Sequence, residues 1–162
     1  MKTIFSFTAA LLLISVSPAA ISALPEPSKN AAASTIVTSG EFGLFNLSDP
    51  SKPSFVPSAS VPLVPDQAYG WIIRVRTDKA KIKWREEFTL PATPTTWGVA
   101  EPVGTRSVSN DGRTSVTERE VSPDRGVIFN SWSVAPGDPK GRYTIRVFID
   151  GSLAKAFEFD VK

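Results

Sequence analysis

The chain of 162 residues contains no cysteine and no histidine. Without cysteine it can form no disulfide and offers no thiolate nucleophile, and without histidine it lacks the commonest general base and metal ligand. These absences exclude serine triads, cysteine proteases and ordinary zinc hydrolases. Only chemistry based on carboxylates, lysine, tyrosine or a serine–lysine pair remains, so we expect no enzyme, no cofactor and no metal site.

The chain also lacks an excess of charge of either sign. Its formal net charge is +2, and removal of Lys2 with the N-terminal segment would leave +1. Such a balance gives no global electrostatic reason for a nucleic-acid partner, and we expect none. No later apolar run approaches the roughly 20 residues of a membrane-spanning helix, so we also expect no transmembrane segment.

The N-terminus has the pattern of an export signal. Lys2 supplies a positive start, Ile4 to Val16 is mostly apolar, and Ile21-Ser22-Ala23 offers small residues for cleavage. We therefore predict a signal peptide at residues 1–23, a flexible tether at 24–34 and a folded domain at 35–162. The mature protein is expected to be exported to a periplasm or to the cell exterior.

The C-terminal residues carry the clearest strand pattern. Apolar residues alternate with polar ones from Tyr143 to Ile149, after a turn rich in proline and glycine. A tyrosine at such a strand start often bonds upstream backbone through its hydroxyl, an arrangement called the tyrosine corner. We predict a three-residue loop, Ile149-Asp150-Gly151, with Gly151 left-handed. This loop pairs Val147 with Leu153 and Tyr143 with Phe157.

A second hairpin is predicted from Tyr69–Thr77 and Lys81–Leu90, joined at Asp78-Lys79. This register pairs Val75 with Ile82 and Ile73 with Trp84 on the core face. The opposite face then carries a basic stripe made of Arg74, Arg76, Lys81, Lys83 and Arg85. The stripe could bind an anionic envelope ligand or an acidic protein, or it could simply be a solvated face.

The remaining segments complete an all-β pattern. Strands are expected near residues 35–45, 105–109, 114–121 and 126–134, and no segment has helical periodicity. Five prolines between Asp49 and Pro65 favour a long ordered loop or a sheet edge there. Short strands without crossover helices favour an antiparallel two-sheet immunoglobulin-like sandwich of seven or eight strands.

Several motifs resemble those of a bacterial family. They are Phe42-Gly43-Leu44-Phe45, Tyr69-Gly70-Trp71, Trp84 to Phe88, and the stretch from Trp132 through Gly141-x-Tyr143 to Phe159. Together they resemble a secreted bacterial family of unknown function with an immunoglobulin-like β-sandwich. The resemblance implies the fold and brings no catalytic motif with it.

Two side chains stand out as candidates for function. Glu86 falls on the apolar face beside Trp84 and Phe88, where loss of water would raise its pKa; alternatively it reaches solvent or an arginine at the strand end. Trp97, in a loop bounded by prolines, could stack on a sugar ring, dock a protein or cover one end of the core.

The composition and these candidates favour an exported, non-enzymatic binding module. The tentative ligand residues are Arg74, Arg76, Lys81, Lys83 and Trp97, with Tyr143 and Gly151 as structural residues. One alternative is an envelope enzyme that works through Glu86 and Glu120. The other is a protein inhibitor or accessory that uses the proline-rich loop 49–65 as its contact.

Overall fold

The computed structural model describes residues 34–46, 52–98 and 104–162, and these residues form ten β-strands. The strands are β1 (Thr35–Asn46), β2 (Ser54–Pro57), β3 (Ser60–Val61), β4 (Ala68–Thr77), β5 (Ile82–Thr89), β6 (Thr105–Val108), β7 (Thr114–Val121), β8 (Val127–Ser133), β9 (Gly141–Ile149) and β10 (Ser152–Val161). The predicted signal peptide and most of the tether lie outside the described residues. Within the described part of the chain, no helix has the length and apolarity needed to cross a membrane.

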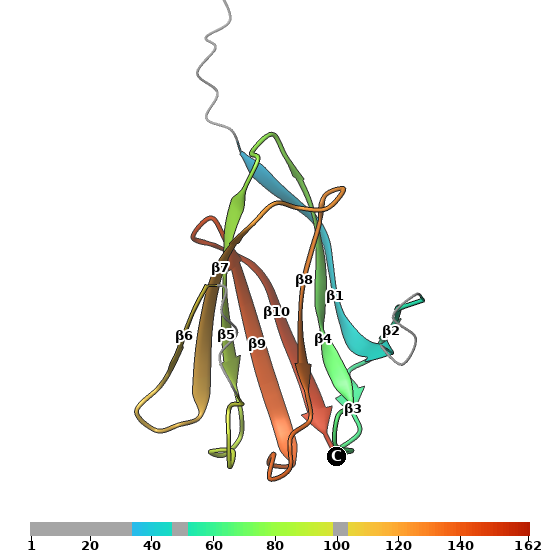
Figure 1. The fold of residues 1–162 in the computed structure, drawn as a ribbon, viewed down its shortest axis with the longest axis vertical. Coiled ribbons are helices and arrows are strands. Elements are labelled where there is room, and N and C mark those ends of the chain that lie inside the picture. Colours follow the sequence, from blue (N-terminus) through green and yellow to red (C-terminus); the bar gives the residue numbers. More distant parts are fainter. Residues whose placement is uncertain (1–33, 47–51, 99–103) are drawn as a thin grey trace, which may run out of the picture. The chain divides into compact units, whose positions relative to one another are not determined.

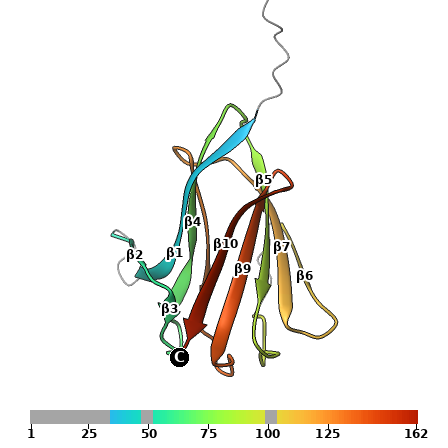
Figure 2. The same ribbon diagram turned by 180° about the vertical axis from the view of Figure 1, so that it is seen from behind.

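The strands form two sheets that face each other (Figure 1). One sheet has four strands in the order β2-β1-β4-β8, and the other has six in the order β3-β10-β9-β5-β7-β6. The short β3 runs parallel to β10, and the other pairs are antiparallel. From behind, β7 and β6 form the side of the molecule farthest from β1 and β2 (Figure 2). The predicted two-sheet sandwich is confirmed, with ten strands in place of seven or eight.

The core lies between the sheets and is rich in aromatic rings. Alternate residues of each strand point inward, so that Trp71 on β4 meets Trp84 on β5 edge to face, with ring centroids 5.4 Å apart. Phe42 on β1 stacks on Phe159 of β10 at 4.0 Å. Burial of these large apolar surfaces is the main stabilising contribution, and it holds one sheet against the other.

The predicted hairpin between residues 69–77 and 81–90 is wrong. β4 pairs with β1 and β8, whereas β5 pairs with β7 and β9, so the two strands belong to opposite sheets. Alternation identified the inward side chains correctly, because Ile73 and Trp84 are both buried. Facing strands of two sheets and paired strands of one sheet show the same alternation, and the pattern alone could not separate them.

The turn between β9 and β10 differs from the predicted three-residue loop. Ile149 pairs directly with Ser152, which leaves a two-residue turn in which Asp150 and Gly151 have φ of 49° and 84°. Positive φ at both positions is the geometry of a tight hairpin turn, and the left-handed Gly151 is confirmed. A bulge between Leu153 and Lys155 then shifts the register.

This bulge changes the predicted cross-strand partners. Tyr143 pairs with Phe159 in place of Phe157, and Val147 pairs with Lys155 in place of Leu153. One extra residue in β10 therefore brings its aromatic side chains onto the core face despite the short turn. The predicted three-residue loop would also have placed these aromatic residues on the core face.

The tyrosine corner is confirmed. Tyr143 is buried, and its hydroxyl donates a hydrogen bond of 2.7 Å to the carbonyl oxygen of Pro139. Burial raises the pKa of this phenol, with a smaller contribution from Asp138. Tyr143 thus fastens the turn before β9 to the start of that strand.

The described part of the proline-rich segment lies at sheet edges. β2 pairs with β1 at the edge of the four-stranded sheet, and β3 pairs with the end of β10. Proline is tolerated there because an edge strand needs hydrogen-bond donors on one side only. The predicted sheet edge is confirmed for these strands, while residues 49–51 lie outside the described residues.

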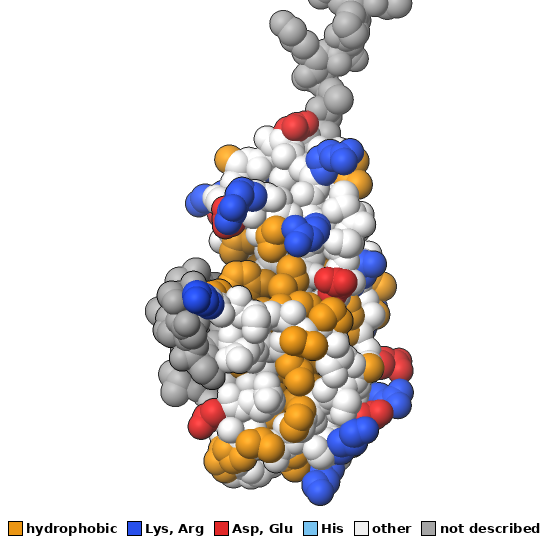
Figure 3. All heavy atoms as spheres, turned by 90° about the vertical axis from the view of Figure 1, so that its right-hand side faces the viewer, with side chains coloured by type: hydrophobic (Ala, Val, Ile, Leu, Met, Phe, Trp, Pro, Cys, Tyr) orange, Lys and Arg blue, Asp and Glu red, His pale blue; other side chains and the backbone are white. Residues whose placement is uncertain are grey.

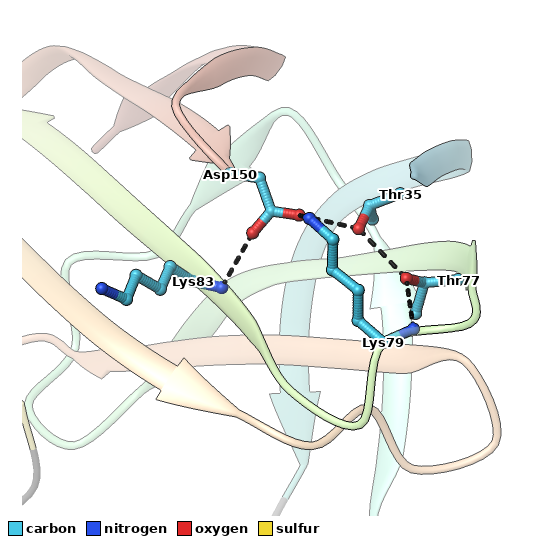
Figure 4. Close-up of polar contacts among 5 residues, drawn as sticks. All are labelled: Thr35, Thr77, Lys79, Lys83 and Asp150. Atoms are coloured by element: carbon cyan, nitrogen blue, oxygen red, sulfur yellow. Dashed lines mark hydrogen bonds and ion pairs between the residues drawn. The ribbon is translucent and has the colours of Figure 1, made fainter. Parts of the chain in front are cut away.

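A solvent-facing carboxylate links the two sheets near the β9–β10 turn (Figure 4). Asp150 accepts hydrogen bonds from the Thr35 hydroxyl (2.8 Å), the Lys79 ammonium (2.7 Å) and the Lys83 backbone N–H (3.1 Å). Thr35 belongs to the four-stranded sheet, whereas Lys83 and the Asp150 turn belong to the six-stranded one. The Lys79 hydrogen bond holds the pKa of Asp150 below its usual value.

Candidate functional site

Glu86 is a completely buried carboxylate in the sandwich core. It projects inward from β5 and accepts hydrogen bonds from the indole N–H of Trp71 and the amide of Asn130 (3.1 Å). The indole N–H of Trp132 donates a third, of 2.8 Å. All three donors lie on the opposite sheet, so Glu86 is a polar link between the two layers.

Burial raises the pKa of Glu86, because the ionised form loses its hydration. The three hydrogen bonds and the more distant charge of Arg119 act in the opposite direction. The sequence prediction of a raised pKa on the apolar face is confirmed in direction. The alternative, a side chain that reaches solvent or an arginine, is wrong because neutral N–H groups of the core satisfy the carboxylate.

Two half-buried indoles lie beyond Glu86, and each is fixed by its own N–H group. Trp132 on β8 donates to Glu86, and Trp97 donates 2.8 Å to the carbonyl oxygen of Gly112. Their rings meet edge to face with centroids 6.0 Å apart, and both pack on Phe88. The orientation of both rings is therefore set before any ligand arrives.

These indoles form part of the wall of a cleft of about 350 Å³. Trp97 and Trp132 are joined there by Tyr69 and Phe88 from the core and by Thr117 from β7. The cleft also reaches Ser131 and Ser133 of β8 and Thr105 of β6. It thus lies where the edge of the four-stranded sheet faces the outer strands of the six-stranded sheet.

Charged side chains surround the aromatic part of the cleft. Arg106 and Arg119 come from β6 and β7, whereas Asp66 and Asp138 come from loops beside β4 and β9. The Arg106 guanidinium bonds the Gly98 carbonyl at 2.7 Å and lies 5.9 Å from the centre of a Trp132 ring. Burial raises the pKa of Asp138, although a backbone N–H from Ala135 opposes this shift. The cleft therefore offers rings, cations and carboxylates to a ligand.

The predicted basic stripe is not a single surface, because its hairpin does not form. Arg74 and Arg76 lie on β4, in the four-stranded sheet, whereas Lys83 lies on β5 and Lys81 just before it, in the other sheet region. Lys81 forms a loose ion pair of 3.8 Å with Glu120. Of the predicted ligand residues, only Trp97 lies in the cleft.

Arg85, the fifth member of the predicted stripe, is neutralised by carboxylates. Its guanidinium contacts Glu87 at 2.6 Å and Glu118 at 3.4 Å, and it lies over the Phe148 ring. Arg146 reaches Glu87 at 3.0 Å from the neighbouring strand. This outer face of the six-stranded sheet therefore carries paired charges.

Glu86 and Glu120 do not form a catalytic pair. Glu120 lies opposite Lys83 in the β5–β7 register, and both are exposed, whereas Glu86 points into the core. The two carboxylates therefore project from opposite faces of the same sheet and cannot act on one substrate. A two-carboxylate mechanism finds no support in this placement.

A second hollow lies on the opposite side of the sandwich, between β1 and β10. Phe42, Pro57 and Phe157 contribute to it, and Figure 3 shows hydrophobic side chains in a band on the side where β1 and β2 lie. Unlike the cleft around Trp97, this groove has no tryptophan fixed by a hydrogen bond. The cleft is the stronger candidate for a ligand site.

Sequence reasoning missed Trp132 and Asn130 as parts of the site. Both lie on the strand predicted at residues 126–134, on the same face as the buried Ile128. A polar Asn at an inward position of a strand was an available signal, because a buried amide needs partners. Its partner, Glu86, is 44 positions away in the chain, so the contact itself was not readable.

Comparisons with known proteins agree with this fold. Residues 40–162 match a family described as "PM0630 beta sandwich domain". An immunoglobulin-like protein (PA1606) from Pseudomonas aeruginosa is similar in structure, with a TM-score of 0.56 and 17% identity over 82% of this chain and 99% of that one. At this identity the likeness establishes the fold alone.

A weaker structural match is the alkylpurine DNA glycosylase AlkC of Pseudomonas fluorescens, bound to DNA containing an abasic site analogue. Its TM-score is 0.38 at 11% identity, over 64% of this chain and 27% of that one, so no argument rests on it. No curated protein matches the chain.

The expected bacterial immunoglobulin-like family is confirmed by the family match and the Pseudomonas aeruginosa structure. The chain belongs to the PM0630 beta sandwich domain family, whose model matches the chain from Gly40, within β1, to its last residue.

Proposed function

We propose that this chain is an exported, non-enzymatic β-sandwich domain that binds a ligand in the cleft beside Trp97 and Trp132. One observation carries the proposal. Two indoles from separate segments form a wall of one cleft, and each ring is fixed by its own N–H hydrogen bond. Fixed aromatic surfaces with a few polar groups nearby are typical of ligand sites, because little ordering remains to be done on binding.

Binding fits the site better than catalysis. The fully buried acid, Glu86, already accepts three hydrogen bonds in the core, so a substrate would have to displace Trp71, Trp132 or Asn130 to reach it. Its role in this proposal is to orient Trp132. Export is supported by the N-terminal sequence pattern, and cleavage after Ala23 is expected.

The ligand chemistry follows from the cleft. Aromatic walls favour a ring or an apolar side chain, while Arg106 and Arg119 favour an acidic group near it. A long anionic polymer bound across four cationic residues is less favoured, because the strands that carry them belong to opposite sheets. These residues are Arg74, Arg76, Lys81 and Lys83. A protein partner or a compact ring-bearing molecule is the better fit.

The proposal is tested by nuclear magnetic resonance of the mature chain, residues 24–162, with indole, phenyl glycosides and N-acetylglucosamine as probes. A probe in the cleft should shift the indole N–H signals of Trp97 and Trp132. The core residues Trp71 and Trp84 are internal controls and should move less, because both are buried and neither lines the cleft. If no probe moves the first pair, or if all four signals move alike, the cleft is not a ligand site.

Two alanine variants, Trp97→Ala in the cleft and Arg76→Ala outside it, test whether probe binding depends on the cleft. Trp97→Ala should abolish the probe-induced shift of Trp132, whereas Arg76→Ala, on the exposed face of β4, should leave it unchanged. Thermal unfolding of both variants establishes whether a lost shift reflects the cleft or the fold.

A further inference from the structure

Strand β8 is an unpaired edge of the four-stranded sheet, since β4 is its only neighbour among the described strands. Two hydrogen bonds fix which of its backbone groups face that edge. Val75 N–H bonds the carbonyl of Gly126, and Val134 N–H bonds the carbonyl of Gln67, in the register that joins β4 and β8. In an antiparallel pair only alternate residues bond a given neighbour, so the even-numbered residues of β8 face β4.

The odd-numbered residues of β8 therefore direct their N–H and C=O groups away from the sheet. The first of them, Val127, bonds Asp124 in the preceding turn, whereas Phe129, Ser131 and Ser133 are exposed. Their side chains point outward, whereas Ile128 and Asn130 point into the core. The edge is thus a row of backbone donors and acceptors without strand partners in the described part of the chain.

The six-stranded sheet extends past this edge. Glu86 of β5 touches Asn130 and Trp132 of β8, so β8 lies opposite β5. Strands β7 and β6 continue beyond β5, and among the described residues no strand of the other sheet lies opposite them. Figure 1 shows both strands to one side of β8. A fifth strand beside β8 would complete the layer over them.

The cleft occupies this missing position. Its wall includes Ser131 and Ser133 from the β8 edge together with Arg106 of β6 and Thr117 of β7. Thr117 is only 6% exposed, and its hydroxyl oxygen has no hydrogen-bond partner among the described residues. A buried hydroxyl that lacks a partner costs free energy, and a polar group entering the cleft could supply one.

We propose that the cleft accepts an extended peptide segment of another protein, which adds to β8 as a fifth strand. This inference rests on the proposed function of the cleft and names its ligand class. Backbone bonds to Phe129, Ser131 and Ser133 would hold the segment, and its alternate side chains would enter the cleft against Trp97 and Trp132. Those inward side chains should be aromatic or apolar, with an acidic one near Arg106.

A second copy of this chain fits the position less well. If β8 paired with another β8, the inward side chains of the added strand would be Ile128, Asn130 and Trp132. These already belong to the core of their own molecule, where Asn130 and Trp132 bond Glu86. The cleft requires a strand whose inward side chains are free, as in an extended segment of a different protein.

The test selects binders from a library of random linear peptides displayed on phage, with the mature chain as target. Selected peptides should carry apolar or aromatic residues at every second position. Ser131→Pro removes one outward N–H while leaving the bonds to β4 intact, because edge strands tolerate proline on the open side. The Ser131→Pro variant should bind the selected peptides at least about tenfold more weakly than the native chain does. The Ser131→Ala variant keeps the N–H and should bind them with native affinity.

Backbone amide exchange of the native chain gives a second measurement that needs no variant. On binding a selected peptide, the amides of Phe129, Ser131 and Ser133 should become protected. Unchanged exchange at these amides, equal binding by Ser131→Pro, or a library that yields no binder would each overturn strand addition. A native dimer that Ser131→Pro abolishes would also overturn it, because a second copy would then occupy the edge.

The probe experiment separates this failure from failure of the cleft itself. Ring-bearing probes should still shift the Trp97 and Trp132 indole signals in Ser131→Pro, since the substitution leaves both rings in place. If the probes bind and no peptide does, the proposed function stands and the peptide inference falls. If neither binds, both fall.

Discussion

Glu86 and Asp150 each link the two sheets through one carboxylate, but they lie in opposite environments. Asp150 lies near the surface, where an ammonium, a hydroxyl and a backbone N–H bind it. Glu86 is fully buried, and its three hydrogen-bond donors are uncharged. The pKa of Asp150 is therefore lowered by its Lys79 hydrogen bond, whereas that of Glu86 is raised by burial.

The difference shows what each link contributes besides cohesion. Asp150 fixes the β9–β10 turn. Both of its carboxylate oxygens already accept hydrogen bonds from neighbouring residues, so it offers little to a ligand. Glu86 accepts hydrogen bonds from two indoles and an amide, and one of those indoles, Trp132, forms part of the wall of the cleft. A buried polar group with such partners specifies one arrangement of its neighbours. We regard Glu86 as a positioning residue for the cleft.

The largest expected effect is that of Glu86→Ala. The substitution leaves the N–H groups of Trp71, Trp132 and Asn130 without their acceptor and opens a cavity in the core. We expect a loss of about 3 to 5 kcal/mol of unfolding free energy, measured by chemical denaturation. A loss below about 1 kcal/mol would show that Glu86 is not a main link between the sheets.

Tyr143→Phe measures an uncharged anchor for comparison with the two carboxylates. The change removes only the hydroxyl that donates to Pro139 and keeps the ring in the core. Denaturation should show a loss of about 1 to 2 kcal/mol, because the half-buried Pro139 carbonyl loses its donor. An unchanged midpoint would mean that the tyrosine corner does not stabilise the fold.

Asp150→Asn should have a smaller effect, of about 0.5 to 1 kcal/mol, because surface ion pairs contribute little. Asparagine tolerates the positive φ of this position and retains one acceptor oxygen, so the loss combines the charge interaction with Lys79 and the hydrogen bonds of the oxygen that is replaced. The same denaturation series provides the value. A loss as large as that of Glu86→Ala would remove the distinction between the surface link and the buried one.

The pH dependence of the two links should have opposite signs. The contribution of Asp150 is present above its unfolded pKa, near 3.8, and is lost as pH falls through its lower folded pKa. Glu86 behaves in the opposite way, because its pKa is raised in the folded state. Its contribution to the free energy of unfolding is complete below its unfolded pKa, near 4.5, and is lost as pH rises through the folded pKa.

Two conservative variants separate these slopes. Relative to the native chain, Glu86→Gln should be most destabilising in acid, and its deficit should shrink as pH rises above 4.5. The deficit of Asp150→Asn should instead shrink as pH falls below 3.8. Parallel slopes for the two variants, measured by denaturation across this range, would contradict the assignment of the two environments.

Much of the fold was predictable because it depends on local patterns. Alternation from Tyr143 to Ile149 predicted β9, the turn before it predicted the tyrosine corner, and the prolines predicted an edge. The pairing of β4 with β5 was wrong because alternation assigns a side chain to a face and says nothing of which strand lies beside it. The register of β10 failed for a related reason, since a single bulge is not visible in the pattern.

The site was predictable only in part. Glu86 was recognised as an acid on an apolar face and Trp97 as a ring in a loop. Their environment depends on contacts distant in sequence, such as Glu86 with Trp132, 46 positions apart. No periodicity encodes such a contact. The cleft itself arises because the sheets have unequal numbers of strands, a property of the assembled fold.

Hydrogen exchange at the indole N–H groups tests most directly whether Glu86 positions the cleft. In the native chain the N–H groups of Trp71 and Trp132, both bonded to Glu86, should be protected. In Glu86→Gln at least one of them should exchange faster and the probe-induced shift of Trp132 should weaken, whereas Asp150→Asn should leave both unchanged. Native protection and probe binding in Glu86→Gln, or equal losses in the two variants, would show that Glu86 does not position the cleft.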